Sequence, residues 1–162
     1  MTGHSMGAAQ AVYGGDEIAR QFPDTKVTVY SFGTPRPGDI AFAHRIHALP
    51  NLETWAVAHR ADTVPQCGID TPPCDERALG YHQVLGNVWY PDGLSGAPPV
   101  TAAKPYYVCD GTGEDPQCQD EVDQRLLNWN DHDLYLNHSM WCCPKGARGP
   151  KGCAFPFSQT DR

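Results

Sequence analysis

The chain has 162 residues, enough for one domain with a substantial core, and its hydrophobic (40%) and charged (19%) fractions are typical of globular proteins. Twelve basic against 19 acidic residues give a formal net charge of −7, and no basic cluster offsets it, which argues against a nucleic-acid partner. No apolar run approaches the roughly 20 residues of a membrane span, so we expect no transmembrane segment.

The first motif along the chain is Gly3-His4-Ser5-Met6-Gly7, which has the Gly-x-Ser-x-Gly pattern of a nucleophile elbow. In such an elbow a serine occupies a strained turn between a strand and a helix, and small residues two positions before and after it avoid a Cβ clash. The backbone N–H of Met6 would then point toward the oxyanion of a tetrahedral intermediate. An ordinary helix N-cap is the competing interpretation of Ser5.

A helical pattern follows the motif, and residues 21–24 end it at a proline. Its predicted apolar stripe is Met6, Ala9, Val12, Tyr13, Ile18 and Ala19, with Asp16, Glu17 and Arg20 off the stripe. Upstream, only Met1 and Thr2 stand where a central strand of roughly 5–6 residues is expected. We therefore expect the chain to be the C-terminal part of a longer protein.

The next elements alternate between strand and helix patterns. Composition predicts strands over 26–32, 52–59 and, as a short final strand, 87–90, with helices over 40–49 and 120–129. This alternation predicts an α/β fold, a parallel sheet with helices on its faces. Such sheets place active-site groups beyond the carboxyl ends of their strands, and Asp62 lies at one such end.

Seven cysteines are typical of an oxidising compartment and predict a secreted protein. Zinc is the alternative, but no Cys-x-x-Cys pair exists. Cys67–Cys74 and Cys109–Cys118 each bridge a proline-containing loop and are expected to form local disulfides. The odd count leaves one cysteine unpaired or paired upstream. The sequon at Asn137 is consistent with secretion.

A serine nucleophile needs a histidine to take its proton and a carboxylate to orient that histidine. Ser5, Asp62 and His132 occur in the chain order Ser, Asp, His of the α/β-hydrolases. From the residues alone, His59, His82 and His138 compete with His132, and Asp62 could instead cap a turn.

Three segments together resemble the class 3 (fungal-type) triacylglycerol lipases, a branch of the α/β-hydrolases. They are the elbow, Phe32–Gly38 (FGTPRPG) and Asp62–Pro65 (DTVP). The family's triad histidine lies in a D-H-x-x-Y segment, which Asp131–Tyr135 matches, and this resemblance selects His132. His82 with Gly86–Tyr90 is similar to a further family segment, although Asn87 stands where the family usually has glutamate. A disulfide like Cys109–Cys118 also occurs in some fungal members.

The resemblance implies a serine carboxylic-ester hydrolase that forms an acyl-enzyme, with Ser5 as nucleophile, His132 as base and acid, Asp62 as its orienting carboxylate and the Met6 N–H as oxyanion donor. It implies a lipid or other ester substrate at a lipid–water interface, and no metal or organic cofactor. Residues 1–143 are expected to form the C-terminal part of the domain and 144–162 a tail. The family's first strands, its lid and its second oxyanion donor are expected upstream, as is a possible disulfide partner.

Two alternatives remain. One is a truncated or inactive lipase-like secreted protein that is cross-linked by disulfides. Under either interpretation the chain alone is expected to be inactive. The other is a cysteine-rich extracellular binding module centred on residues 109–153.

Overall fold

The computed structural model describes residues 1–67, 76–94, 97, 99–118, 122–136 and 138–140. The predictions for the tail after residue 143, for a disulfide at Cys74 and for the sequon at Asn137 lie outside the described residues.

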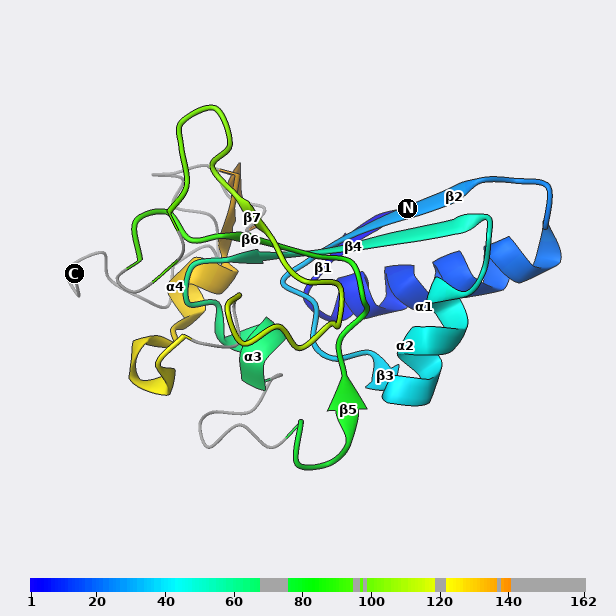
Figure 1. Cartoon of the computed structure of the whole chain (residues 1–162), viewed down its shortest axis with the longest axis horizontal. Coiled ribbons are helices and arrows are strands. Elements are labelled where there is room, and N and C mark those ends of the chain that lie inside the picture. The colour runs from blue at the N-terminus through cyan, green and yellow to red at the C-terminus, as the bar shows by residue number, and fades with distance from the viewer. Residues whose placement is uncertain (68–75, 95–96, 98, 119–121, 137, 141–162) are drawn as a thin grey trace, which may run out of the picture.

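A five-stranded sheet forms the centre of the molecule, in the order β1-β2-β4-β6-β7 (Figure 1). Strands β1 (Thr2–His4), β2 (Val27–Phe32), β4 (Leu52–His59) and β6 (Asn87–Tyr90) are parallel neighbours. Strand β7 (Tyr107–Val108) pairs antiparallel with β6. The predicted α/β fold is confirmed, but β6 is not the last strand of the sheet.

Helices α1 (Met6–Gln21) and α2 (Ile40–His47) link successive parallel strands and lie on the same side of the sheet (Figure 1). Their apolar side chains meet those of β2 and β4 in one core cluster. Its buried members are Ala11, Val12, Ala19, Val27, Val29, Ile46, Leu52, Ala56 and Val84. Each fully buried aliphatic side chain of this kind contributes roughly 1.5–3 kcal/mol of burial free energy.

The buried face of α1 differs from the predicted stripe. Met6, Tyr13 and Ile18 are exposed, whereas the buried residues are Ala8, Ala9, Ala11, Val12, Gly15, Asp16 and Ala19. Asp16 belongs to the buried face because Arg45 of α2 donates two hydrogen bonds to its carboxylate, at 2.8 and 3.0 Å. Arg20 adds a third at 3.2 Å. This ion pair joins the two helices.

Short elements surround the carboxyl edge of the sheet. They are α3 (Thr63–Cys67), the 3-10 helix η2 (Gln124–Leu126), α4 (Trp129–His132), and β8 (Leu134–Tyr135), which pairs with β9 (His138–Ser139). A separate pair, β3 (Gly38–Asp39) with β5 (Tyr81–His82), lies beside α2 (Figure 1). The predicted helix over 120–129 is wrong. Asp123 caps η2 and Asn128 caps α4, so two short turns form where one helix was expected.

Strand β1 occupies the start of the elbow motif and follows the register of β2, with Thr2 opposite Tyr30 and His4 opposite Phe32. Three residues therefore supply the strand that a nucleophile elbow requires. Across the described ranges, no helix combines the length and apolar character needed to cross a membrane.

Asp16→Asn should destabilise the fold in a pH-dependent way. Burial alone would raise the pKa of Asp16, but hydrogen bonds from Arg45 and Arg20 outweigh it and hold the pKa below its usual value of 3.8. A lowered pKa in the folded state stabilises the protein above pH 3.8, and this contribution is lost as pH falls through the folded-state pKa. We expect the substitution to lower the free energy of unfolding by about 1–2 kcal/mol at pH 7, which lies between the contributions typical of exposed and of buried ion pairs. At pH 3 the free energy of unfolding should fall by less.

Urea unfolding at the two pH values measures the difference, with the exposed Asp24→Asn as the control. An equal loss at both pH values would contradict the ion-pair account.

Candidate functional site: the carboxyl edge of the sheet

Ser5 lies between β1 and α1 with φ 58° and ψ −131°, a conformation that residues with a Cβ rarely adopt. Its backbone N–H donates to the Phe32 carbonyl of β2 at 2.9 Å, which fixes this turn to the sheet. Its side chain makes no helix-capping hydrogen bond. The N-cap interpretation of Ser5 therefore lacks the bond that defines a cap, and the strained turn has the geometry of an elbow.

The two flanking glycines differ in what their positions permit. A Cβ on Gly3 would lie 2.1 Å from the backbone oxygen of Gly7, so a side chain there requires the backbone to move. Apart from its chain neighbours and the backbone of its own helix, a Cβ on Gly7 would meet no described atom within 4 Å. In the part of the chain that the structure describes, the expectation that both positions must be small is therefore correct at Gly3 and wrong at Gly7.

Met6 is the first residue of α1, and its side chain is 68% exposed. The first four N–H groups of a helix lack intrahelical acceptors, and the helix dipole adds partial positive charge there. The Met6 N–H thus lies beside Ser5 at a helix end that favours a developing anion.

Asp62 and His132 form a buried pair at the same edge, with exposed fractions of 1% and 4%. His132 Nδ1 lies 2.9 Å from Asp62 Oδ1 and 3.0 Å from Oδ2. Asp62 follows β4, where its Oδ1 also accepts from the Val64 N–H at 2.8 Å. An ionised carboxylate accepts but does not donate, so its contact fixes the proton of His132 on Nδ1 and leaves Nε2 as the acceptor.

Each motif residue of the D-H-x-x-Y segment contacts the loop after β4. Asp131 accepts from the Ala61 N–H at 3.1 Å and pairs with Arg60 at 3.3 Å. Tyr135, which is fully buried, donates its hydroxyl proton to Asp62 Oδ2. The spacing of the segment therefore brings three side chains onto three consecutive residues of one loop, Arg60 to Asp62.

Tyr135 remains a donor because its surroundings oppose its ionisation. Burial raises the pKa of Tyr135 well above its ordinary value, and the neighbouring Asp62 carboxylate raises the pKa further.

Gly33, directly after β2, makes room for this cluster. Its φ is +55°, and a Cβ there would lie 2.8 Å from Asp62 Oδ2 and 3.0 Å from both His132 Nδ1 and the Tyr135 hydroxyl. Only a residue without a side chain fits both the backbone conformation and the space.

His4 links the elbow to the segment that carries His132. Its Nε2 lies 2.8 Å from the His132 carbonyl oxygen, and the two ring centroids are 4.4 Å apart. Trp129 contacts the His132 ring edge-to-face at 5.4 Å. Burial lowers the pKa of His4, and the nearby His132 lowers the pKa further.

The structure thus joins Asp62 to His132 by hydrogen bonds and brings the elbow against them through His4. Among the described residues, no hydrogen bond joins the Ser5 hydroxyl to the His132 ring; such bonds often form only when a ligand is present. The other candidate histidines have different side-chain partners, although His59 also lies close to the site, 3.1 Å from the Asp131 carbonyl oxygen. His59 contacts Asp92 at 3.1 Å, His82 contacts the Gln83 carbonyl at 2.7 Å, and His138 is exposed in β9.

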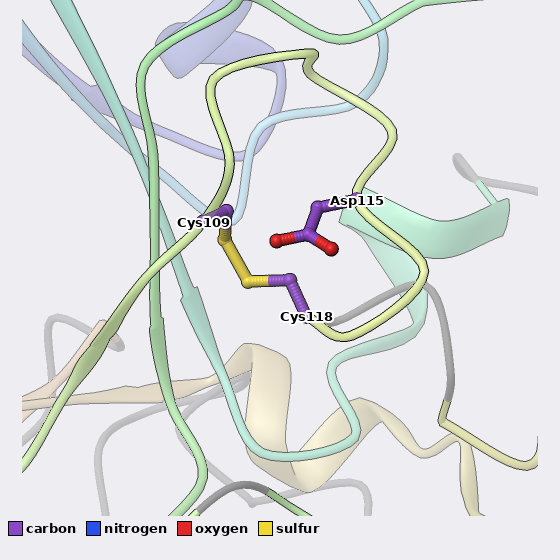
Figure 2. A group of neighbouring side chains, drawn as sticks. All are labelled: Cys109, Asp115 and Cys118. Atoms are coloured by element: carbon purple, nitrogen blue, oxygen red, sulfur yellow. A yellow bond between two sulfur atoms is a disulfide. The ribbon is translucent and has the colours of Figure 1, made fainter.

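The predicted Cys109–Cys118 disulfide is confirmed (Figure 2). With Asp115 these two cysteines form a buried group of potential metal ligands, but both sulfur atoms are used in the disulfide. Both Asp115 oxygens accept backbone N–H groups, from Asp110 and Gln117 at 2.8 Å each. This group therefore closes a loop and does not present thiolates to a metal.

Sequence reasoning gave no role to His4, Gly33 or Tyr135. His4 occupies a variable position of the elbow motif, and Gly33 belongs to a segment whose glycines and prolines only indicated a turn. Tyr135 could have been recognised from the sequence. It occupies a fixed position in the motif, and a tyrosine that is buried needs a hydrogen-bond partner for its hydroxyl, which here is the Asp62 carboxylate.

Comparisons with known proteins show a likeness to lipases. A family model for lipase (class 3) matches residues 1–71. A lipase of Caenorhabditis elegans is 30% identical over 93% of this chain and 47% of its own length. A secreted mono- and diacylglycerol lipase of Malassezia restricta is 28% identical over 88% of this chain and 44% of its own length.

Solved structures show the same fold. MDLA of Penicillium cyclopium aligns with a TM-score of 0.58 and 25% identity, covering 83% of this chain and 45% of its own. A fungal lipase in complex with an inhibitor aligns with a TM-score of 0.65 and 22% identity, covering 84% of this chain and 46% of its own. The chain therefore spans about half the length of the relatives it matches, and the predicted resemblance to class 3 lipases is confirmed.

Gly3→Ala and Gly7→Ala should have opposite effects on stability. The first places a methyl group against a backbone oxygen and should cost about 3 kcal/mol. The second adds a helix-favouring residue in open space and should be neutral or stabilise by up to about 1 kcal/mol. Urea unfolding of both variants checks this, and equal losses would contradict the elbow geometry.

Tyr135→Phe should lower the free energy of unfolding by about 1–3 kcal/mol, because it removes a donor from a buried carboxylate and keeps the ring. Thermal and urea unfolding measure the loss. The matched control is Tyr30→Phe, an exposed residue of β2 that should change stability little. If the two variants were equally stable, the Tyr135–Asp62 hydrogen bond would not contribute to the stability of the fold.

Proposed function

We propose that this chain, which is similar to class 3 lipases of the α/β-hydrolase fold, carries the catalytic residues of a serine carboxylic-ester hydrolase: Ser5, His132 and Asp62. The observation that carries the proposal is the buried Asp62–His132 pair next to a serine in a strained elbow at the start of a helix. The family likeness supports the reaction class, and the geometry supports the assignment of each role.

In the proposed reaction His132 Nε2 takes the proton of the Ser5 hydroxyl as Oγ attacks the ester carbonyl carbon. The Met6 N–H donates to the resulting oxyanion, and Asp62 stabilises the imidazolium. The bond to the alcohol then breaks, and His132 gives the proton to the leaving oxygen. Water attacks the acyl-enzyme with His132 again as base, which releases the carboxylic acid and restores Ser5.

We propose acylglycerol-type lipid esters as the substrate class. The Malassezia relative is named for mono- and diacylglycerols, and one structural neighbour is described as a model for interfacial activation in lipases. These names suggest action at a lipid–water interface. Secretion is proposed from the Cys109–Cys118 disulfide and from the secreted Malassezia relative.

Replacing the proposed nucleophile, base or carboxylate should abolish ester hydrolysis in the natural protein that contains this sequence. We expect Ser5→Ala and His132→Ala to lower kcat/KM for p-nitrophenyl butyrate by about 10⁴-fold or more, and Asp62→Asn by about 10⁴-fold, because the triad acts as a unit.

The matched control is His82→Ala, whose ring contacts its neighbour's carbonyl and should affect mainly stability. Full hydrolysis by Ser5→Ala would exclude Ser5 as nucleophile. Inactivity of the unmodified natural protein on soluble and emulsified esters would favour a lipase-like protein without turnover.

A further inference from the structure

We propose that His4, the residue before the proposed nucleophile, is a positioning residue whose Nε2–H holds the His132 segment against the elbow. This inference rests on the function proposed above. It concerns a contact between residues 128 positions apart that directly joins the nucleophile turn to the segment carrying the proposed base.

The contact needs a defined proton on His4. The His132 carbonyl oxygen can only accept, so the His4 Nε2 at 2.8 Å must carry a hydrogen. Burial and the adjacent His132 lower the pKa of His4, which favours a neutral ring near neutral pH. A neutral His4 donates this bond without placing a positive charge beside His132 when His132 itself becomes protonated.

The contact completes the orientation of His132. Asp62 holds Nδ1, the His4 ring lies on one side at 4.4 Å, and Trp129 contacts another at 5.4 Å. These contacts fix the ring but leave Nε2 without a described hydrogen-bond partner. These contacts do not set the distance between the backbone of residue 132 and the turn that carries Ser5. The His4 hydrogen bond sets this distance.

The elbow is fixed on its other side as well. Ser5 N–H donates to Phe32 of β2, so the turn cannot follow a displaced His132 segment. Without the His4 donor the segment would be located only by its bonds to the loop after β4, through Arg60, Ala61 and Asp62, and by no bond to the elbow. Because proton transfer depends on hydrogen-bond geometry, a small displacement should slow turnover more than it weakens substrate binding.

His4→Gln and His4→Met form a matched pair that tests the donor. The two side chains have similar length, and only the Gln amide can donate to the His132 carbonyl. The test measures kcat and KM for p-nitrophenyl butyrate with each variant of the natural protein. Titration of the active sites with a fluorophosphonate gives the concentration of competent enzyme and so corrects for any misfolded fraction. The Met variant should have a kcat about tenfold below that of the Gln variant, with similar KM. His44→Met, at an exposed position of α2, serves as the control and should match the unmodified protein.

Equal kcat values for the Gln and Met variants would overturn the positioning role, and so would a difference confined to KM. The two proposals fail separately. If Ser5→Ala abolishes hydrolysis and the His4 pair is equal, only the role of His4 is wrong. If Ser5→Ala retains full hydrolysis, both proposals are wrong.

Discussion

The buried carboxylate of Asp62 is the constraint on which the rest of the site depends. A carboxylate removed from water costs several kcal/mol unless donors replace its hydration. Its donors come from three places: the Val64 N–H of the adjoining helix α3, the His132 ring of α4 and the Tyr135 hydroxyl of β8. Satisfying one charge therefore fixes the loop after β4, helix α4 and strand β8 relative to one another. Gly33 of the neighbouring strand end must lack a side chain for the same reason.

A second buried charge fixes the other side of this edge. Arg36 follows β2 with a side chain that is 1% exposed, and its guanidinium donates two bonds of 2.8 Å to Glu114 and one to the Gln66 carbonyl. Burial alone would raise the pKa of Glu114, but Arg36 outweighs it and lowers the pKa to about 2. Glu114 lies within the loop that Cys109–Cys118 closes. The disulfide thus holds the partner of a buried cation, which ties the Phe32–Gly38 segment to a distant part of the chain.

The sequence predicted what local patterns determine. Strands β4 and β6 have the predicted bounds, because β-branched and aromatic runs are bounded there by turn residues. The sequence did not predict features that depend on contacts between distant elements. Asp16 lies on the buried face of α1 because an arginine of another helix meets it, and no periodicity in α1 reveals that partner. Similarly, residue patterns left four histidines open, and only the family resemblance selected His132. The role of His4 depends on a contact that no sequence spacing encodes.

Backbone strain in the described residues concentrates around this edge. The non-glycine residues with positive φ are Ser5, Arg60, Asp92 and Leu136, and each adjoins the site. Arg60 precedes the Asp62 loop and donates to the Asp92 carbonyl at 2.7 Å, while Asp92 contacts His59, which itself contacts the Asp131 carbonyl. Such conformations cost of order 1–3 kcal/mol each and persist only where surrounding contacts determine them. The hydrogen bonds that link Arg60, Asp92 and His59 supply those contacts. The fold therefore holds the site in a strained arrangement through polar bonds at the sheet edge, whereas the apolar core under α1 and α2 supplies the stability that offsets this strain.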